Sequence, residues 1–210
     1  MGNKELVQQL VKDEVLKTER IIRAFELVDR INFCIHSQKC NAYKDEPLEI
    51  YEGQTISQPT TVAIMTEALD VHPGQKVLEI GSGSGYQAAI LSKIVGDKGK
   101  VYTIEYLQKL YEFASKNLEA YTNVDVFKGD GSKGLKKHAP YDRIIVTAGA
   151  PVVPKSLEEQ LAKGGKIVIP VGDKALYSMK IITKEEKGFK EEDIGLFRFV
   201  QLVGEEGWKD

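Results

Sequence analysis

The second half of the chain alternates short apolar runs with amphipathic stretches, and this alternation restricts the fold more than any other feature. Apolar runs at residues 76–80, 100–104, 124–127, 143–146 and 166–169 are typical of buried strands. Apolar residues at helical spacing predict helices at 86–95, 107–118 and 156–161. Strands that alternate with helices form βαβ units, so we expect an α/β fold with a doubly wound, mostly parallel sheet.

The two ends of the chain have different patterns. No helical pattern separates residues 175–183 from 195–203, which predicts two antiparallel strands at one sheet edge, joined through the charged stretch 184–193. Before residue 72, apolar residues recur at helical spacing, and Thr18 precedes one such run as a candidate N-cap. We therefore expect an N-terminal helical and loop extension over residues 1–71 and the main domain over 72–210.

Composition excludes several classes of function. The 29 basic and 31 acidic side chains give a formal net charge of -2, without the basic excess typical of nucleic-acid-binding proteins. Cys34 and Cys40 lack the paired spacings of a zinc site, so we expect free thiols and no metal. The N-terminus has no signal-peptide pattern, and no apolar run approaches ~18 residues. We expect a cytoplasmic protein that binds neither nucleic acid nor membrane.

A glycine-rich turn follows the first predicted strand. Gly81, Gly83 and Gly85 alternate with serines, and glycine permits both a tight turn and close approach of a ligand to the backbone. Read from Gly83 through Ala88, the turn fits the dinucleotide pattern. Read from Gly81 and preceded by Glu79, it has the form common among S-adenosylmethionine enzymes. Glu79 favours that cofactor, because a carboxylate suits its ammonium group and gains nothing from a pyrophosphate.

Two more acidic residues stand at the ends of later strands. Glu105 closes the second strand, where a carboxylate can accept from both ribose hydroxyls in either cofactor class. Asp130 follows the third strand in a Gly-Asp-Gly sequence, and either accepts from an adenine amino group or serves only as a turn residue. The three acids lie at successive strand ends on one sheet edge and together outline one adenosine-binding site.

Further motifs lie outside the glycine turn. The motif that best separates this chain from other S-adenosylmethionine enzymes is Gly-Gln-Thr-Ile-Ser-Gln-Pro at 53–59. Further motifs lie at 45–48, 140–142, 148–151, 170–172 and 199–203. From about residue 28 to 208 the chain resembles the protein-L-isoaspartate O-methyltransferase family. The resemblance implies a Rossmann-like class I methyltransferase fold with seven strands and S-adenosylmethionine as cofactor. It implies methyl transfer to the α-carboxylate of L-isoaspartyl residues in damaged polypeptides, after which a succinimide forms without the enzyme and permits repair.

The resemblance also implies site residues and an enzyme that acts on isoaspartyl-containing polypeptides, and we expect a monomer. Ser57 would lie nearest the reacting carboxylate. Substrate would be held by Ala148, Val200, Leu202 and Val203. The cofactor would be held by Thr55, Ile56, Glu79, Gly81, Ser82, Gly83, Gly85, Glu105, Tyr106, Asp130 and Gly131. The chain departs from the family at Thr60, where His or an aromatic residue is usual, and at Gln201, where Pro is usual.

The chemistry and its alternatives follow from the residue types. A carboxylate with a pKa of about 4 is already ionised at neutral pH, so methyl transfer to it needs positioning rather than a general base. Ser57 also precedes a predicted helix, where serine is a preferred N-cap. The alternatives are a methyltransferase of the same fold that acts on tRNA, a non-catalytic protein that binds S-adenosylmethionine or isoaspartate, and an NAD-dependent oxidoreductase.

Overall fold

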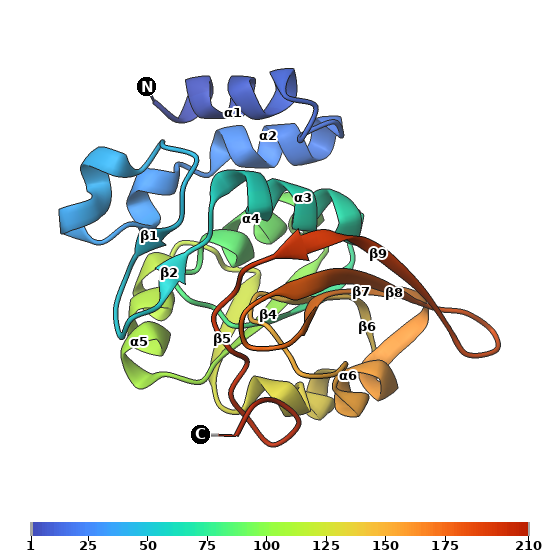
Figure 1. Ribbon diagram of the computed structural model, residues 1–210. Helices are drawn as coiled ribbons and strands as arrows, with labels where there is room; N and C mark the ends of the chain where they lie inside the picture. Colours follow the sequence, from blue (N-terminus) through green and yellow to red (C-terminus); the bar gives the residue numbers. More distant parts are fainter. Residues whose placement is uncertain (1, 210) are drawn as a thin grey trace.

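The five apolar runs and two further strands form a seven-stranded sheet, which Figure 1 shows in the computed structural model. The structure describes residues 2–209; Met1 and Asp210, the outer ends of the two predicted domains, lie outside the described residues. The strands, in sheet order, are β5 (Val124–Lys128), β4 (Lys100–Glu105), β3 (Lys76–Ile80), β6 (Tyr141–Val146), β7 (Leu161–Gly172), β8 (Tyr177–Lys184) and β9 (Phe189–Phe197). Pairing is parallel from β5 to β7 and antiparallel for β8 and β9, which confirms the predicted sheet.

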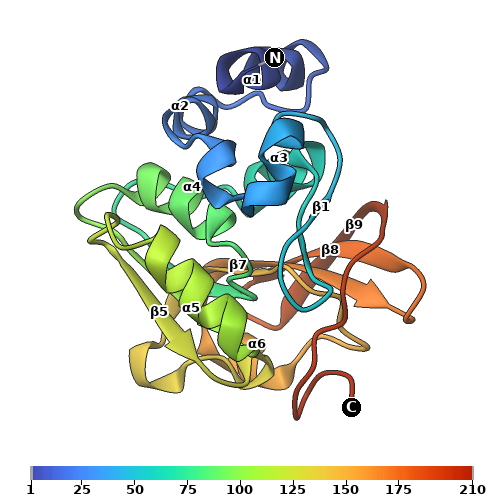
Figure 2. The same cartoon turned by 90° about the vertical axis from the view of Figure 1, so that its left-hand side faces the viewer.

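Helices cover both faces of the sheet (Figures 1 and 2). The α-helices are α1 (Asn3–Lys12), α2 (Glu19–Leu27), α3 (Pro59–Leu69), α4 (Tyr86–Val95), α5 (Gln108–Asn117) and α6 (Lys155–Gln160). Successive strand residues point to opposite faces. Val77 accordingly packs in the core that contains the first five helices, whereas Leu78 packs in the core that contains Leu157 of α6. The predicted doubly wound arrangement is confirmed.

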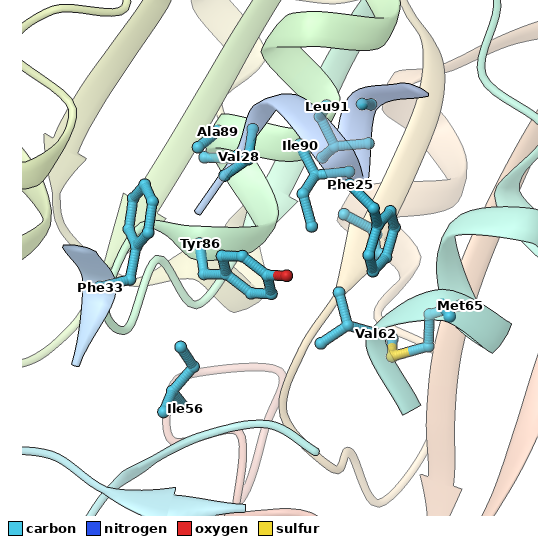
Figure 3. Close-up of a cluster of buried hydrophobic side chains, with 14 of the residues drawn as sticks. Phe25, Val28, Phe33, Ile56, Val62, Met65, Tyr86, Ala89, Ile90 and Leu91 are labelled. Atoms are coloured by element: carbon cyan, nitrogen blue, oxygen red, sulfur yellow. The ribbon is translucent and has the colours of Figure 1, made fainter. Parts of the chain in front are cut away.

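The N-terminal segment packs on the same core as α4. Figure 3 shows Tyr86 of α4 among Phe25, Phe33 and Ile56, which come from three earlier elements. The ring centroids of Phe33 and Tyr86 are 5.5 Å apart, and Phe25 meets Tyr86 edge-on. The predicted extension and main domain therefore share one hydrophobic core. Their division at residues 71 and 72 stays a prediction.

Short elements connect these helices to the sheet. They are a hairpin of β1 (Leu48–Glu49) and β2 (Thr55–Ile56), and four 3₁₀ turns: η1 (Arg30–Phe33), η2 (His36–Asn41), η3 (Gly131–Lys133) and η4 (Lys136–His138). Thr18 is the N-cap residue of α2, as predicted. Its hydroxyl, however, makes no capping bond and donates instead to Glu67 Oε2 at 2.6 Å. The hydroxyl therefore ties the start of α2 to α3.

The last strand differs from the prediction. β9 spans Phe189–Phe197, so the charged residues 190–193 lie within the strand rather than in a connection, and residues 198–203 leave the sheet. The reason is its position at the sheet edge, where residues 189–196 are exposed on both faces. No apolar alternation is required of such a strand, and charged side chains are favoured there.

Three further findings concern membrane-spanning helices, metal sites and paired cysteines. Within residues 2–209, no helix combines the length and apolarity needed to cross a membrane. In the same residues, no group of three His, Cys, Asp or Glu side chains is arranged to hold a metal ion. Cys34 is buried, Cys40 is exposed, and both are free thiols.

Candidate active site

A cavity of about 300 Å³ opens at the C-terminal ends of β3, β4 and β6, within the size range of small-molecule sites. The β1–β2 hairpin and the tail that follows β9 both line it. Figures 1 and 2 show these two segments side by side, the hairpin in cyan and the tail in red. The cavity therefore lies where doubly wound sheets bind ligands, and these two segments from outside the sheet complete its lining.

The structure brings most of the predicted site residues together in this cavity. Those that line it are Thr55, Ile56, Ser57, Glu79, Gly81, Ser82, Gly83, Glu105, Tyr106, Gly131, Ala148, Val200, Leu202 and Val203. Gly85 and Asp130 do not line it. Gly85 has φ +87°, and a Cβ there would lie 2.9 Å from Leu118 Cγ. Its lack of a side chain therefore serves the packing of the turn against Leu118.

The glycine turn is shaped by positive backbone φ angles and, at Gly81, by a contact that leaves no room for a side chain. Gly81 has φ +94°, and a Cβ there would lie 2.6 Å from Thr147 Oγ1. The Thr147 hydroxyl donates to the Gly81 carbonyl at 2.7 Å. Gly83 also has positive φ, and its N–H donates to Glu105 Oε2 at 2.8 Å. These contacts fix the turn between β3, β4 and the residue after β6.

Glu79 lacks a partner for one of its two carboxylate oxygens. Its side chain is fully buried; Oε2 accepts from the Thr103 hydroxyl, whereas Oε1 has no partner in residues 2–209. Burial raises the pKa of this carboxyl to about 8; the Thr103 hydrogen bond opposes the rise, and the charge of Glu105 adds to it. A cation in the cavity would favour the ionised form, so the site fits the ammonium group of S-adenosylmethionine.

Glu105 is held by the backbone on both sides. Oε2 accepts from Gly83 N–H and Oε1 accepts from Leu107 N–H at 2.9 Å. Burial raises the pKa of this carboxyl, and the backbone hydrogen bonds oppose that rise. Each oxygen retains further acceptor capacity. The carboxylate is therefore held in place at the cavity wall with acceptor sites for ribose hydroxyls.

Asp130 uses its carboxylate on neighbouring backbone and side-chain groups. Oδ1 accepts from the N–H and hydroxyl of Ser132, at 2.9 and 2.7 Å, and Oδ2 accepts from Glu205 N–H at 2.8 Å. The residue therefore joins the loop after β5 to the end of the chain. Its contact with an adenine amino group stays a prediction, whereas the adjacent Gly131 lines the cavity.

Ser57 lies between β2 and α3, and its predicted alternative role as a helix cap is wrong. The N-cap residue of α3 is Gln58, and no side chain in that position caps the helix. Asp45 caps it instead: Oδ1 accepts from Thr60 N–H at 2.8 Å, and Oδ2 accepts from the Thr60 hydroxyl at 2.7 Å. Thr60 is thus turned to Asp45 and does not line the cavity. Within the described part of the chain, the Ser57 hydroxyl has no side-chain or backbone partner.

Separate contacts hold the hairpin and the tail. The ring of Tyr51, in the hairpin turn, meets Phe113 of α5 edge-on at 5.1 Å, with Lys109 Nζ 4.4 Å from its centroid. In the tail, the carbonyl of Gly149 accepts from Leu202 N–H and from Trp208 Nε1, both at 2.9 Å. The hairpin is therefore anchored to α5, and the tail is anchored to the segment that follows β6.

Several cavity residues were not predicted from the sequence. They include Gln54, Ser84, Gln87 and Thr147. Thr147 directly follows the strand over 143–146, so its position at the same sheet edge was a usable signal. Gln87 lies in the first turn of α4, and its amide donates to the Thr66 hydroxyl at 3.1 Å. That contact joins residues 21 positions apart and leaves no local pattern.

Comparison with known proteins gives a whole-chain match. The family model described as Protein-L-isoaspartate(D-aspartate) O-methyltransferase (PCMT) matches residues 1–207. A relative from Pyrococcus horikoshii, named protein-L-isoaspartate O-methyltransferase, is 47% identical over 99% of this chain and 95% of its own length. A relative of the same name from Thermococcus sibiricus is 48% identical over 98% of this chain and 95% of its own.

Solved structures agree with the sequence match. One named protein-L-isoaspartate O-methyltransferase has a TM-score of 0.89 at 33% identity, covering 98% of this chain and 67% of its own. Another, from Plasmodium falciparum and in complex with S-adenosyl-L-homocysteine, has a TM-score of 0.86 and covers 97% of this chain and 99% of its own. At 23% identity, this second likeness shows the fold alone.

Proposed function

The chain belongs to the protein-L-isoaspartate(D-aspartate) O-methyltransferase family, and from this premise we propose how its own residues carry out the reaction. The protein is an S-adenosylmethionine-dependent enzyme that methylates L-isoaspartyl residues of proteins and peptides. The observation that carries this conclusion is the family match from residue 1 to 207. What remains to be proposed is the role of each residue in the cavity.

The β3 and β4 ends bind the methyl donor. When bound, S-adenosylmethionine supplies a methyl group already activated on a sulfonium. Glu79 faces the ammonium group, because its unpaired buried oxygen needs a positive partner. Glu105 accepts from the ribose hydroxyls, and the Gly81–Gly83 backbone allows the cofactor to approach closely. Asp130 and Gly131 lie on the adenine side.

Ser57 orients the acceptor carboxylate. Ser57 lines the cavity, and within residues 2–209 its hydroxyl has no hydrogen-bond partner, which leaves it available as a donor. The acceptor is ionised at neutral pH, so no protein group has to remove a proton from it. The protein's contribution is alignment of the carboxylate with the methyl group, and positioning of this kind supplies ~7–11 kcal/mol in favourable cases.

Ala148, Val200, Leu202 and Val203 hold the polypeptide on the tail side of the mouth. We further propose that the enzyme acts as a monomer in the cytoplasm, without nucleic-acid or membrane partners. The formal net charge of -2 disfavours phosphate-rich partners.

Radiolabelled methyl transfer tests the function against its alternatives. Three acceptors are compared: an isoaspartyl hexapeptide, the hexapeptide of the same sequence with a normal aspartyl residue, and unmodified tRNA. We expect label on the isoaspartyl peptide alone. Label on tRNA would favour a nucleic-acid methyltransferase, and tight binding of S-adenosylhomocysteine without transfer to any acceptor would favour a non-catalytic binder. Thermal stabilisation by NADH but not by S-adenosylhomocysteine would favour an oxidoreductase.

A further inference from the structure

A chain of hydroxyl groups connects the cavity lining to the buried carboxyl group of Glu79. Ser82 in the glycine turn lines the cavity, and its Oγ lies 2.7 Å from Thr103 Oγ1. The Thr103 hydroxyl donates in turn to Glu79 Oε2. Thr103 has a single hydroxyl proton, so while it donates to Glu79 it accepts from Ser82. The three side chains therefore form one directed chain of hydrogen bonds that ends on Oε2.

Register and burial hold this chain in one arrangement. Thr103 is opposite Glu79 in the parallel pairing of β3 with β4, and both side chains are fully buried. The β-branched side chain of threonine is restricted at χ1, and burial removes the water that would compete for its hydroxyl. Thr103 does not itself line the cavity, so its hydroxyl can influence a ligand only through Glu79 or Ser82.

We propose that Thr103 is a positioning residue for the methyl donor. Its hydroxyl occupies Oε2 of Glu79 and leaves Oε1, which has no partner in residues 2–209, for the ammonium group of the cofactor. Because Oε2 is already an acceptor, the proton of the neutral carboxyl group lies on Oε1 and is released to solvent as the ammonium group binds. The inference rests on the proposed function, because it requires the amino-acid end of S-adenosylmethionine beside Glu79.

The charges around Glu79 leave this task to Thr103. Glu105 at the end of β4 opposes the ionisation of Glu79, whereas the Thr103 hydrogen bond favours it. The other charged side chains on the surrounding elements are exposed or have contacts elsewhere: Lys76 of β3 with His138, Lys100 of β4 with Asp125, Asp142 and Arg143 of β6 with backbone groups, Glu67 of α3 with Thr18, Lys93 of α4 with Tyr121, and the exposed Lys109, Glu112 and Lys116 of α5. Before the cofactor binds, the Thr103 hydroxyl is therefore the group that favours the ionised carboxylate.

Two variants separate the hydroxyl from the shape of the side chain. Thr103→Val removes the hydroxyl at nearly constant shape, and Thr103→Ser is the matched control that keeps it. We expect Thr103→Val to raise the Kd for S-adenosylhomocysteine at pH 7 about ten- to hundredfold, as the loss of one hydrogen bond to a charged group implies. Thr103→Ser should keep this Kd within about threefold.

Two further readouts distinguish positioning from a general structural role. The Kd for 5′-methylthioadenosine, which lacks the amino-acid end, should stay within about twofold in Thr103→Val. The KM for S-adenosylmethionine should rise with the Kd for S-adenosylhomocysteine, whereas kcat at saturating cofactor and peptide should stay within about twofold. In the Glu79→Gln background no ionised carboxylate remains, so adding Thr103→Val should change the Kd less than about threefold.

A second measurement uses the wild-type protein and does not depend on how a variant folds. A buried, hydrogen-bonded hydroxyl proton exchanges slowly enough to be observed by NMR, and that of Thr103 is identified by its proximity to the methyl group of isotope-labelled threonine. We expect this resonance to move downfield when S-adenosylhomocysteine is added, because its acceptor becomes charged. Addition of 5′-methylthioadenosine should leave it in place.

Different results overturn different claims. An unchanged Kd in Thr103→Val, an equal loss of affinity for 5′-methylthioadenosine, or an equal effect in the Glu79→Gln background would refute the role of Thr103. A Thr103 hydroxyl that exchanges too fast to be observed, or that responds equally to both ligands, would refute it in the wild-type protein. All of these results leave the enzyme's function intact. If the wild-type protein neither binds S-adenosylhomocysteine nor methylates an isoaspartyl hexapeptide, the proposed function and this inference are both wrong.

Discussion

The ionisation of Glu79 should make binding of the cofactor depend on pH. The free protein holds this carboxyl largely protonated at neutral pH, because burial raises its pKa to about 8. The ammonium group of S-adenosylhomocysteine favours the ionised form, so binding must release a proton. With a pKa of about 8, the fraction ionised rises about ninefold between pH 6 and 7, which corresponds to about 1.3 kcal/mol. The Kd should fall by the same factor over this interval.

Isothermal calorimetry in two buffers of different ionisation enthalpy measures both the Kd and the proton release. Glu79→Gln keeps an acceptor for Thr103 but cannot ionise, so its Kd should not change between pH 6 and 7. A second control is 5′-methylthioadenosine, which lacks the amino-acid end and should bind the wild-type protein equally at both pH values. A wild-type Kd for S-adenosylhomocysteine that is constant over this interval, with no proton released, would refute the pairing of Glu79 with the ammonium group.

The same pKa shift predicts the pH dependence of stability. The pKa of Glu79 is higher in the folded protein than its ordinary value of 4.5, so the folded state binds the proton more tightly than the unfolded state. The resulting contribution to the free energy of unfolding is fully present below about pH 4.5 and is lost as pH rises through about 8. Thermal unfolding of the ligand-free Glu79→Gln protein should lack this loss.

Three further predictions concern the other cavity residues and the chemical step. Ser57→Ala should lower kcat by ~10–100-fold, equivalent to ~1.4–2.7 kcal/mol at the barrier, and should leave Tm unchanged. Asp45→Ala should instead lower the free energy of unfolding by ~0.5–2 kcal/mol, because Asp45 caps the helix. A stable Ser57→Asp enzyme with wild-type turnover would contradict the role of Ser57. Glu105→Ala should weaken the binding of S-adenosylhomocysteine by ~2–4 kcal/mol, measured by calorimetry. An unchanged Kd would show that the ribose does not bind Glu105. Single-turnover methyl transfer at saturating cofactor should be nearly constant from about pH 6 to 8, since the acceptor is already ionised; a steep rise traced to a protein group would require a general base.

The parts of the fold and site that depend on local patterns could be predicted from the sequence. The strand over 76–80 and the helix over 86–95 match the structure residue by residue, because a buried strand, a glycine turn and a helix with apolar residues at helical spacing each have a short-range signature. Glu79 and Glu105 were recognised because parallel strands bring their carboxyl ends to one edge. The shared position of Glu79 and Glu105 follows from the order and direction of the strands, so it can be predicted without knowing any side-chain contact.

The parts that depend on distant contacts could not be predicted. Asp130 and Glu205 N–H are 75 positions apart, and nothing near Asp130 indicates that the end of the chain reaches it. Ser57 precedes a helix and so has the local pattern of a cap, whereas the residue that caps the helix, Asp45, lies 15 positions before its partner Thr60. β9 was misplaced because its exposure removes the apolar pattern on which strand prediction relies. Each difference between prediction and structure arises where a tertiary contact or a position at the sheet edge determines the structure in place of the local sequence pattern.

Conversion of an isoaspartyl peptide over time tests the central claim most directly. The peptide is incubated with the enzyme and S-adenosylmethionine, and chromatography follows the isoaspartyl, succinimide and aspartyl forms together with S-adenosylhomocysteine. We expect the isoaspartyl form to decline only when enzyme and S-adenosylmethionine are both present, while the succinimide and then the aspartyl form increase. Formation of S-adenosylhomocysteine with the isoaspartyl residue left intact and a stable methyl group elsewhere on the peptide would contradict it.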